Sequence, residues 1–201
     1  STGQRASAAA ISAGAPSHAA SGIVRADRDT PVVTTERLVL RGHRVDDFED
    51  YAALRSDPEV VRYLGGKPST PSESWSRILN SVGHWTLMGY GFWAIEERSS
   101  GRYVGEAGLA EFKRDIEPGF EGAPEAGWVL APWSHGRGYA TEAARAVLAW
   151  GEKNIGMMRC VCMIEPEHGA SLRVADKCGF RPFAETEFKG APVILLERVS
   201  S

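Results

Sequence analysis

Seven stretches of the chain have the apolar pattern of a β-strand, either alternating with polar residues or nearly continuous. The expected strands are residues 36–43, 90–98, 101–112, 125–131, 158–166, 180–188 and 191–199. The stretch 158–164 is almost continuously apolar, which is typical of an interior strand. Gly101 and Gly190 lie in short turns that predict antiparallel pairing of the flanking strands.

Helical spacing of apolar residues fills the segments between these strands. Helices are expected at residues 45–56, 57–65, 70–89, 138–154 and 169–179. The helix at 70–89 has the clearest start, because Thr70 can cap it, Pro71 suits its first turn and Glu73 can complete a capping box. Asp46 and Glu49 predict a similar box for the first helix. This order of elements predicts a mixed sheet with helices on both faces.

Residues 1–30 differ in composition from everything that follows. Alanine, serine and glycine dominate this segment, and large apolar side chains are rare. Such a segment cannot bury enough apolar surface to offset the conformational entropy lost on folding. We therefore expect a disordered tail at 1–30, followed by a single folded domain at 31–201.

Composition narrows the classes of function. The chain has 23 Lys and Arg against 26 Asp and Glu, which argues against a broad basic surface for nucleic acid. No apolar run reaches the roughly 20 residues that cross a bilayer, so no membrane partner is expected. The three cysteines, Cys160, Cys162 and Cys178, do not form a disulfide framework and indicate a reducing, cytoplasmic location. The second cysteine pair of a structural zinc site is missing from the sequence, so no metal is expected.

The turn HGRGYA, residues 135–140, connects the strand at 125–131 to the helix at 138–154. The first N–H groups of a helix lack partners within the helix, and the helix dipole is positive at that end. Gly136 and Gly138 would let an anion approach these groups, and Arg137 could add a charge-assisted contact. The same glycines also suit a tight strand-to-helix connection. The turn alone therefore leaves an anion site and a structural turn both open.

The turn is similar to the Q/R-x-x-G-x-G/A signature of the GNAT N-acetyltransferase superfamily. Four further stretches, TERLVLR, DPEVVRYL, EAGWVLAPW and EPEHGASLRVADKCGF, occur in the order of that family. Residues 34–198 resemble its ribosomal-protein N-terminal alanine/serine acetyltransferase branch. The resemblance implies an α+β fold with a central, mostly antiparallel seven-stranded sheet and helices on both faces. It also implies acetyl-CoA as the acyl donor.

The resemblance further implies which residues bind this donor. In the family, main-chain amides of the loop hold the pyrophosphate, and the pantetheine arm enters a gap between the strands at 125–131 and 158–166. The implied donor-binding residues are Trp128, Val129, Leu130, His135, Gly136, Arg137, Gly138, Tyr139, Ala140, Thr141, His168 and Ser171. His135 stands where the signature has Gln or Arg, and His168 stands where the family pattern has Asn.

Acetyl transfer to an amine requires a base for the amine and a proton or hydrogen bond for the departing thiolate. Glu125 begins the strand on which related enzymes often carry a glutamate, and Ser171 matches a family serine near the sulfur of the donor. These two are the implied catalytic residues. Glu125 could instead be a solvated strand-end carboxylate, and Ser171 a helix cap. Glu106 and Glu111 are lesser candidates for the base.

The expected function is N-acetylation of a primary amine by direct transfer in a ternary complex with acetyl-CoA. A protein N-terminal α-amine and a small-molecule amine are both open as acceptors, and a monomer and a homodimer are both open as assemblies. The alternative is a catalytically weak CoA-binding sensor or regulatory module.

Overall fold

The computed structural model describes residues 30–200, so the predicted tail lies outside it except for Thr30. The described part contains one sheet of eight strands in the order β1-β2-β3-β4-β5-β6-β8-β7. The strands are β1 Val33–Thr34, β2 Leu38–Arg41, β3 Phe92–Glu97, β4 Tyr103–Ala110, β5 Glu125–Leu130, β6 Arg159–Ile164, β7 Arg181–Phe188 and β8 Ala191–Val199. The prediction of seven strands is wrong by one. The additional strand, β1, pairs with β2 over two residues, which is too short to show an alternating pattern.

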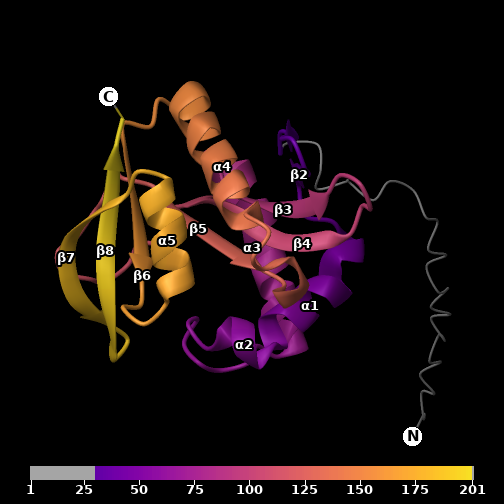
Figure 1. Ribbon diagram of the computed structural model, residues 1–201, viewed down its shortest axis with the longest axis horizontal. Helices are drawn as coiled ribbons and strands as arrows, with labels where there is room; N and C mark the ends of the chain where they lie inside the picture. The colour runs from indigo at the N-terminus through magenta and orange to yellow at the C-terminus, as the bar shows by residue number, and fades with distance from the viewer. Residues whose placement is uncertain (1–29, 201) are drawn as a thin grey trace, which may run out of the picture.

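The helices cover both faces of this mostly antiparallel sheet, as the sequence predicted (Figure 1). They are α1 Phe48–Ser56, α2 Pro58–Val61, α3 Pro71–Met88, α4 Tyr139–Ile155 and α5 Gly169–Lys177. One hydrophobic cluster joins α1 and α3 to the sheet, and a larger one joins α4 and α5 to it. Within residues 30–200, no helix is both long enough and apolar enough to cross a membrane.

The two predicted capping boxes have different outcomes. The box at α3 is confirmed, because Thr70 Oγ1 accepts from the Glu73 N–H at 3.2 Å and the Glu73 carboxylate accepts from the Thr70 N–H at 2.7 Å. The box between Asp46 and Glu49 does not form. Residues 45–47 instead make a 3-10 turn, and Asp47 accepts from the Arg44 N–H while pairing with a buried arginine of β2. The local spacing could not show this distant partner.

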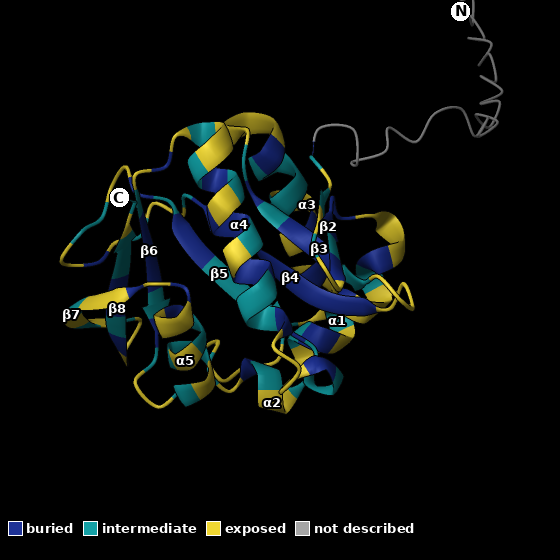
Figure 2. Ribbon diagram, turned by 45° about the horizontal axis from the view of Figure 1, so that its top comes forward, coloured by how far each residue is buried: buried dark blue, intermediate teal, exposed yellow. Residues whose placement is uncertain are grey.

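The centre of the sheet is β4, whose eight residues are all buried (dark blue in Figure 2). Three tryptophans, Trp85, Trp93 and Trp150, meet edge to face beside it, with ring centroids 4.6 to 5.3 Å apart. Edge-to-face packing of this kind adds to the stabilisation from burial alone. These rings therefore belong to the core that supports the sheet.

Strands β5 and β6 are parallel neighbours that diverge. β5 pairs with β4 along its whole length, from Ala110 opposite Glu125 to Gly105 opposite Leu130. Its register with β6 contains one pair, Glu125 opposite Val161, after which β6 continues in contact with β8. The gap implied by the family resemblance is therefore present and opens toward the end of β5.

Candidate active site

A cavity of about 320 Å³ lies where the diverging strands meet the starts of α4 and α5. Every predicted donor-binding residue except Arg137 lines it. The predicted residues that line the cavity are Trp128, Val129, Leu130, His135, Gly136, Gly138, Tyr139, Ala140, Thr141, His168 and Ser171. The structure thus brings together residues that are more than forty positions apart in the sequence.

The loop before α4 has the backbone geometry of an anion site. Gly136 and Gly138 have φ values of 74° and 79°, in the left-handed region that favours glycine. The first hydrogen bond of α4 runs from the Glu142 N–H to the Gly138 carbonyl at 3.1 Å. The N–H groups of residues 139–141 therefore precede the helical ladder, and these residues line the cavity. Main-chain donors at the positive end of a helix suit a phosphate or another anion.

The end of β5 directs further main-chain groups into the gap. The Ala131 N–H bonds to the Val104 carbonyl at 2.8 Å, so alternation along the antiparallel ladder turns the Val129 N–H toward β4. The same alternation turns the Leu130 N–H away from β4, toward the gap. The Leu130 carbonyl lies 2.8 Å from His135 Nε2, which ties the loop to the strand. Leu130 is therefore better placed than Val129 to offer an N–H to a ligand.

The start of α5 contributes a serine and a histidine. Ser171 Oγ and His168 Nε2 lie 2.9 Å apart, and the His168 ring stacks on Tyr63 with centroids 4.2 Å apart. Burial and the neighbouring His135 lower the pKa of His168, which favours its neutral form. Its other nitrogen, Nδ1, is buried and has no hydrogen-bond partner among the described residues. A buried polar atom of this kind at a cavity wall suits a polar group of a ligand.

Several lining residues were missed from the sequence. Arg173 and Lys177 line the cavity from α5, and their i, i+4 spacing on a predicted helix was the available signal. Glu59, Val60 and Leu64 line it from α2 and the turn that follows. These three are about seventy residues from the loop in sequence, and no local pattern links them to it.

The match to known proteins decides the family. Residues 37–181 match the family model described as an acetyltransferase (GNAT) domain. The chain belongs to this GNAT acetyltransferase family. It is 31% identical over 174 residues to the uncharacterised protein YkkB of Bacillus subtilis strain 168. The alignment covers 84% of this chain and 95% of that protein.

Solved structures of GNAT proteins agree in fold. A Bordetella pertussis protein assigned to the GNAT acetyltransferases has a TM-score of 0.75 at 34% identity, with 84% of this chain and 99% of the other covered. An acetyltransferase from Agrobacterium tumefaciens has a TM-score of 0.71 at 27% identity, with 85% and 95% covered. A ribosomal-protein-S5-alanine acetyltransferase from Vibrio fischeri shares the fold, with a TM-score of 0.68 at 16% identity, and the alignment covers 84% of this chain and 96% of the other. The predicted family and the N-acetyltransferase class are confirmed.

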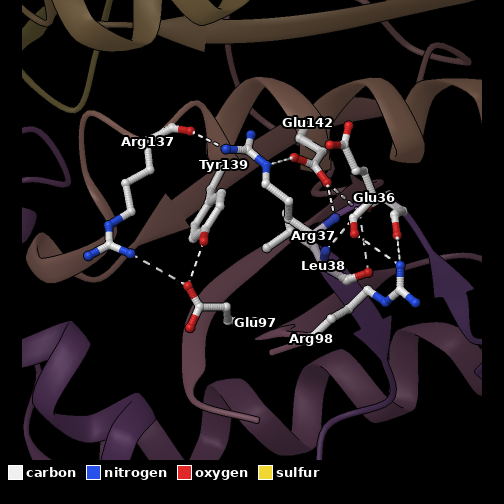
Figure 3. Close-up of polar contacts among 9 residues, drawn as sticks. Glu36, Arg37, Leu38, Glu97, Arg98, Arg137, Tyr139 and Glu142 are labelled. Atoms are coloured by element: carbon white, nitrogen blue, oxygen red, sulfur yellow. Dashed lines mark hydrogen bonds and ion pairs between the residues drawn. The ribbon is translucent and has the colours of Figure 1, made fainter. Parts of the chain in front are cut away.

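Two predicted residues of this GNAT enzyme lie apart from the cavity. Glu125 is buried at the start of β5, and its carboxylate accepts from Arg114 Nε at 2.5 Å and from Arg114 Nη2 at 2.8 Å. The Arg137 side chain is half-exposed and lies 3.5 Å from the Glu97 carboxylate (Figure 3). A base role for Glu125 and a ligand contact for Arg137 both stay predictions.

Proposed function

We propose that this GNAT protein binds acetyl-CoA in the cavity and transfers the acetyl group directly to a primary amine, within a ternary complex. The observation that carries the proposal is the meeting of two features in one cavity. One is the row of unpaired N–H groups at residues 139–141, and the other is the gap between β5 and β6. The first suits a diphosphate, and the second suits an extended arm with amide groups.

The residues of the cavity fit such a donor. Arg173 and Lys177 supply positive charge beside the loop, which complements phosphate groups. His168 Nδ1 is a buried polar atom without a protein partner, and an amide of the pantetheine arm could satisfy it. The departure of His168 from the Asn of the family pattern is thus compatible with donor binding.

Three residues have distinct roles in the proposed transfer. Acetyl-CoA supplies the acetyl group as an activated thioester. The Leu130 N–H, directed into the gap, donates to the carbonyl oxygen on which negative charge develops. The Ser171 hydroxyl, held by His168, donates to the departing sulfur. Glu125, at the opposite end of β5 from Leu130, accepts through bridging water the proton that the ammonium form of the acceptor loses before it attacks. The proton that the nitrogen loses after the C–N bond forms leaves on the sulfur, as the free thiol.

The cysteines favour direct transfer over a cysteine-bound acetyl group. Burial raises the pKa of Cys160 to about 12, and burial also raises the pKa of Cys162 and of Cys178. A thiol attacks as the thiolate, and these thiols are protonated at neutral pH. The amine itself is therefore the nucleophile in the proposal.

The acceptor is proposed only as a class, a primary amine of a protein N-terminus or of a small molecule. Solved structures with this fold include a spermidine N-acetyltransferase from Vibrio cholerae with CoA and spermine, and an aminoglycoside acetyltransferase with CoA. Each is 15% identical to this chain, so the likeness concerns the fold alone. Glu59, on the cavity wall formed by α2, offers a negative charge to a cationic amine.

An acceptor screen tests the proposal. The full chain is incubated with acetyl-CoA and with polyamines, aminoglycosides and peptides that begin with free Ala or Ser. Release of free thiol is measured, and the acetylated product is identified by mass spectrometry. Peptides with a blocked N-terminus serve as controls. We expect thiol release that depends on one class of free amine. Tight CoA binding without transfer to any amine would favour the sensor alternative and overturn the proposal.

A further inference from the structure

The loop proposed to bind the diphosphate is held from outside by one guanidinium. Arg37, just before β2, donates from Nη1 to the Arg137 carbonyl at 2.7 Å (Figure 3). Its guanidinium lies 4.8 Å from the centre of the Tyr139 ring, and Nη2 lies 3.4 Å from where a Cβ at Gly138 would be. Arg37 therefore contacts Arg137 and Tyr139 and lies beside the glycine between them.

The same guanidinium neutralises an acidic residue in the first turn of α4. Arg37 Nε donates to Glu142 Oε2 at 2.7 Å, while Thr35 Oγ1 and the Arg37 N–H donate to Oε1 at 2.7 and 2.8 Å. Burial acts to raise the pKa of Glu142, but these hydrogen bonds outweigh it and lower the pKa. An ionised carboxylate at this position favours the helix dipole and repels an anionic ligand. The pair with Arg37 offsets that repulsion.

We propose that Arg37 is a positioning residue for the acyl donor, and this inference rests on the proposed function. By holding the Arg137 carbonyl and the Glu142 carboxylate together, Arg37 keeps the N–H groups of residues 139–141 directed into the cavity. It acts through the loop and does not need to touch the ligand. Its loss lets the loop move and leaves the Glu142 carboxylate without a counter-charge beside the anion site.

A direct contact with the ligand is the competing explanation. Arg37 also borders an open hollow next to the cavity, together with Arg145 and Lys177. Glu36 and Glu142 line the hollow as well, so a phosphate there would meet three cations and two carboxylates. CoA and dephospho-CoA differ by the 3′-phosphate, so comparing them separates the two explanations. Positioning weakens both ligands by the same factor, whereas a contact with the 3′-phosphate weakens CoA alone.

The experiment measures binding of CoA and of dephospho-CoA to the full chain by calorimetry. Arg37→Gln is compared with Arg37→Lys and with the control Arg98→Gln. Arg98 is a matched control because it donates to the carbonyls of Thr35 and Glu36 at 2.9 Å and anchors the same segment without contacting the loop. Thermal unfolding of each variant without ligand shows whether it is folded.

We expect Arg37→Gln to weaken both ligands about tenfold, Arg37→Lys to weaken them less, and Arg98→Gln to change them less than about twofold. In the transfer assay, Arg37→Gln should raise the KM for acetyl-CoA and leave kcat within about twofold. The positioning role would be overturned if Arg37→Gln left both affinities unchanged or weakened CoA binding alone. It would also be overturned if Arg98→Gln lost as much affinity as Arg37→Gln. Failure of the unmodified chain to bind CoA would instead overturn the proposed function itself.

Discussion

Two polar regions flank β5, and they use their polar groups in opposite ways. At the cavity, the donors are main-chain N–H groups of residues 139–141, which face space that a ligand can enter. Next to Val129, on the neighbouring strand β4, the Glu106 carboxylate is enclosed by side chains. The first region is open, and its backbone dipoles are joined by the charged side chains of Arg173 and Lys177. The second is closed and its charge comes from ionised residues.

The closed region explains why a central carboxylate is a poor candidate for the base. Glu106 is 2% exposed, pairs with Arg55, accepts from the Tyr51 hydroxyl at 3.2 Å and lies 3.4 Å from His43 Nε2. Burial acts to raise the pKa of Glu106, but Arg55 and His43 outweigh it and bring the pKa to about 2. Glu106 thus combines complete enclosure with fixed ion pairs, which supports a structural role in the fold.

The largest effect should come from Glu106→Gln, which tests whether the closed region is structural. The change leaves the buried Arg55 guanidinium without its counter-charge. We expect the free energy of unfolding to fall by about 3–5 kcal/mol, measured by chemical denaturation. Glu185→Gln, on the exposed surface of β7, should change it by less than about 0.5 kcal/mol. Equal small losses in both variants would contradict the structural role.

The same carboxylate predicts a dependence of stability on pH. The pKa of Glu106 is about 2 in the folded chain, against the ordinary value of 4.5. Because the folded state binds the proton more weakly, the contribution of Glu106 is complete above about pH 4.5 and is lost as the pH falls toward 2. The difference in stability between the unmodified chain and Glu106→Gln should therefore shrink across this window. A difference that stays constant with pH would be inconsistent with the low pKa.

Glu125→Gln tests whether the buried carboxylate at the start of β5, which lies apart from the cavity, takes part in the chemistry. We expect turnover at neutral pH to fall about 100-fold, because the amine loses its proton acceptor, while acetyl-CoA binding is unchanged. Arg114→Gln is the matched variant, since it breaks the same ion pair and keeps the carboxylate. An equal loss of turnover in Arg114→Gln would mean that Glu125 acts by holding the segment between β4 and β5, which carries Arg114, in place.

Gly138→Val tests the open region directly. A β-branched side chain at a φ of 79° distorts the loop, and we expect acetyl-CoA to bind about 30-fold more weakly. Gly156→Val is the matched control, because Gly156 ends the same helix with a φ of 62° and has open space around it. Both variants should lose stability, and Gly138→Val alone should lose affinity in calorimetry. Equal affinities would reject the loop as the diphosphate site.

Ser171→Ala should have the smallest effect. Removing the hydroxyl withdraws one hydrogen bond from the departing sulfur, so we expect kcat to fall about fivefold with acetyl-CoA affinity within about twofold. Ser171→Thr keeps a hydroxyl and should recover most of the rate in the thiol-release assay. A loss of affinity without a loss of kcat would assign Ser171 to donor binding alone.

Many of the residues that line the cavity could be predicted from the sequence, because the signals that mark them are local. Helix caps, glycine turns and apolar periodicity depend on residues within a few positions of each other, as at Thr70 and Glu73. The loop at 136–141 combines such signals with a family resemblance, and the structure places it at a cavity. The missed strand β1 and the start of α1 show the limit. One is too short for a pattern, and Asp47 in the other is engaged by Arg41 from β2.

The sequence by itself determined the order of the elements, the position of the glycine turn before α4 and the family, because each of these is carried by short-range patterns of residues. Only the tertiary structure decided which charged side chains a ligand can reach and which are buried in ion pairs. Arg37 reaches Arg137 across 100 positions, and Arg55 reaches Glu106 across 51. Burial and pairing set the charge state and accessibility of such groups, and both arise only when distant segments pack together.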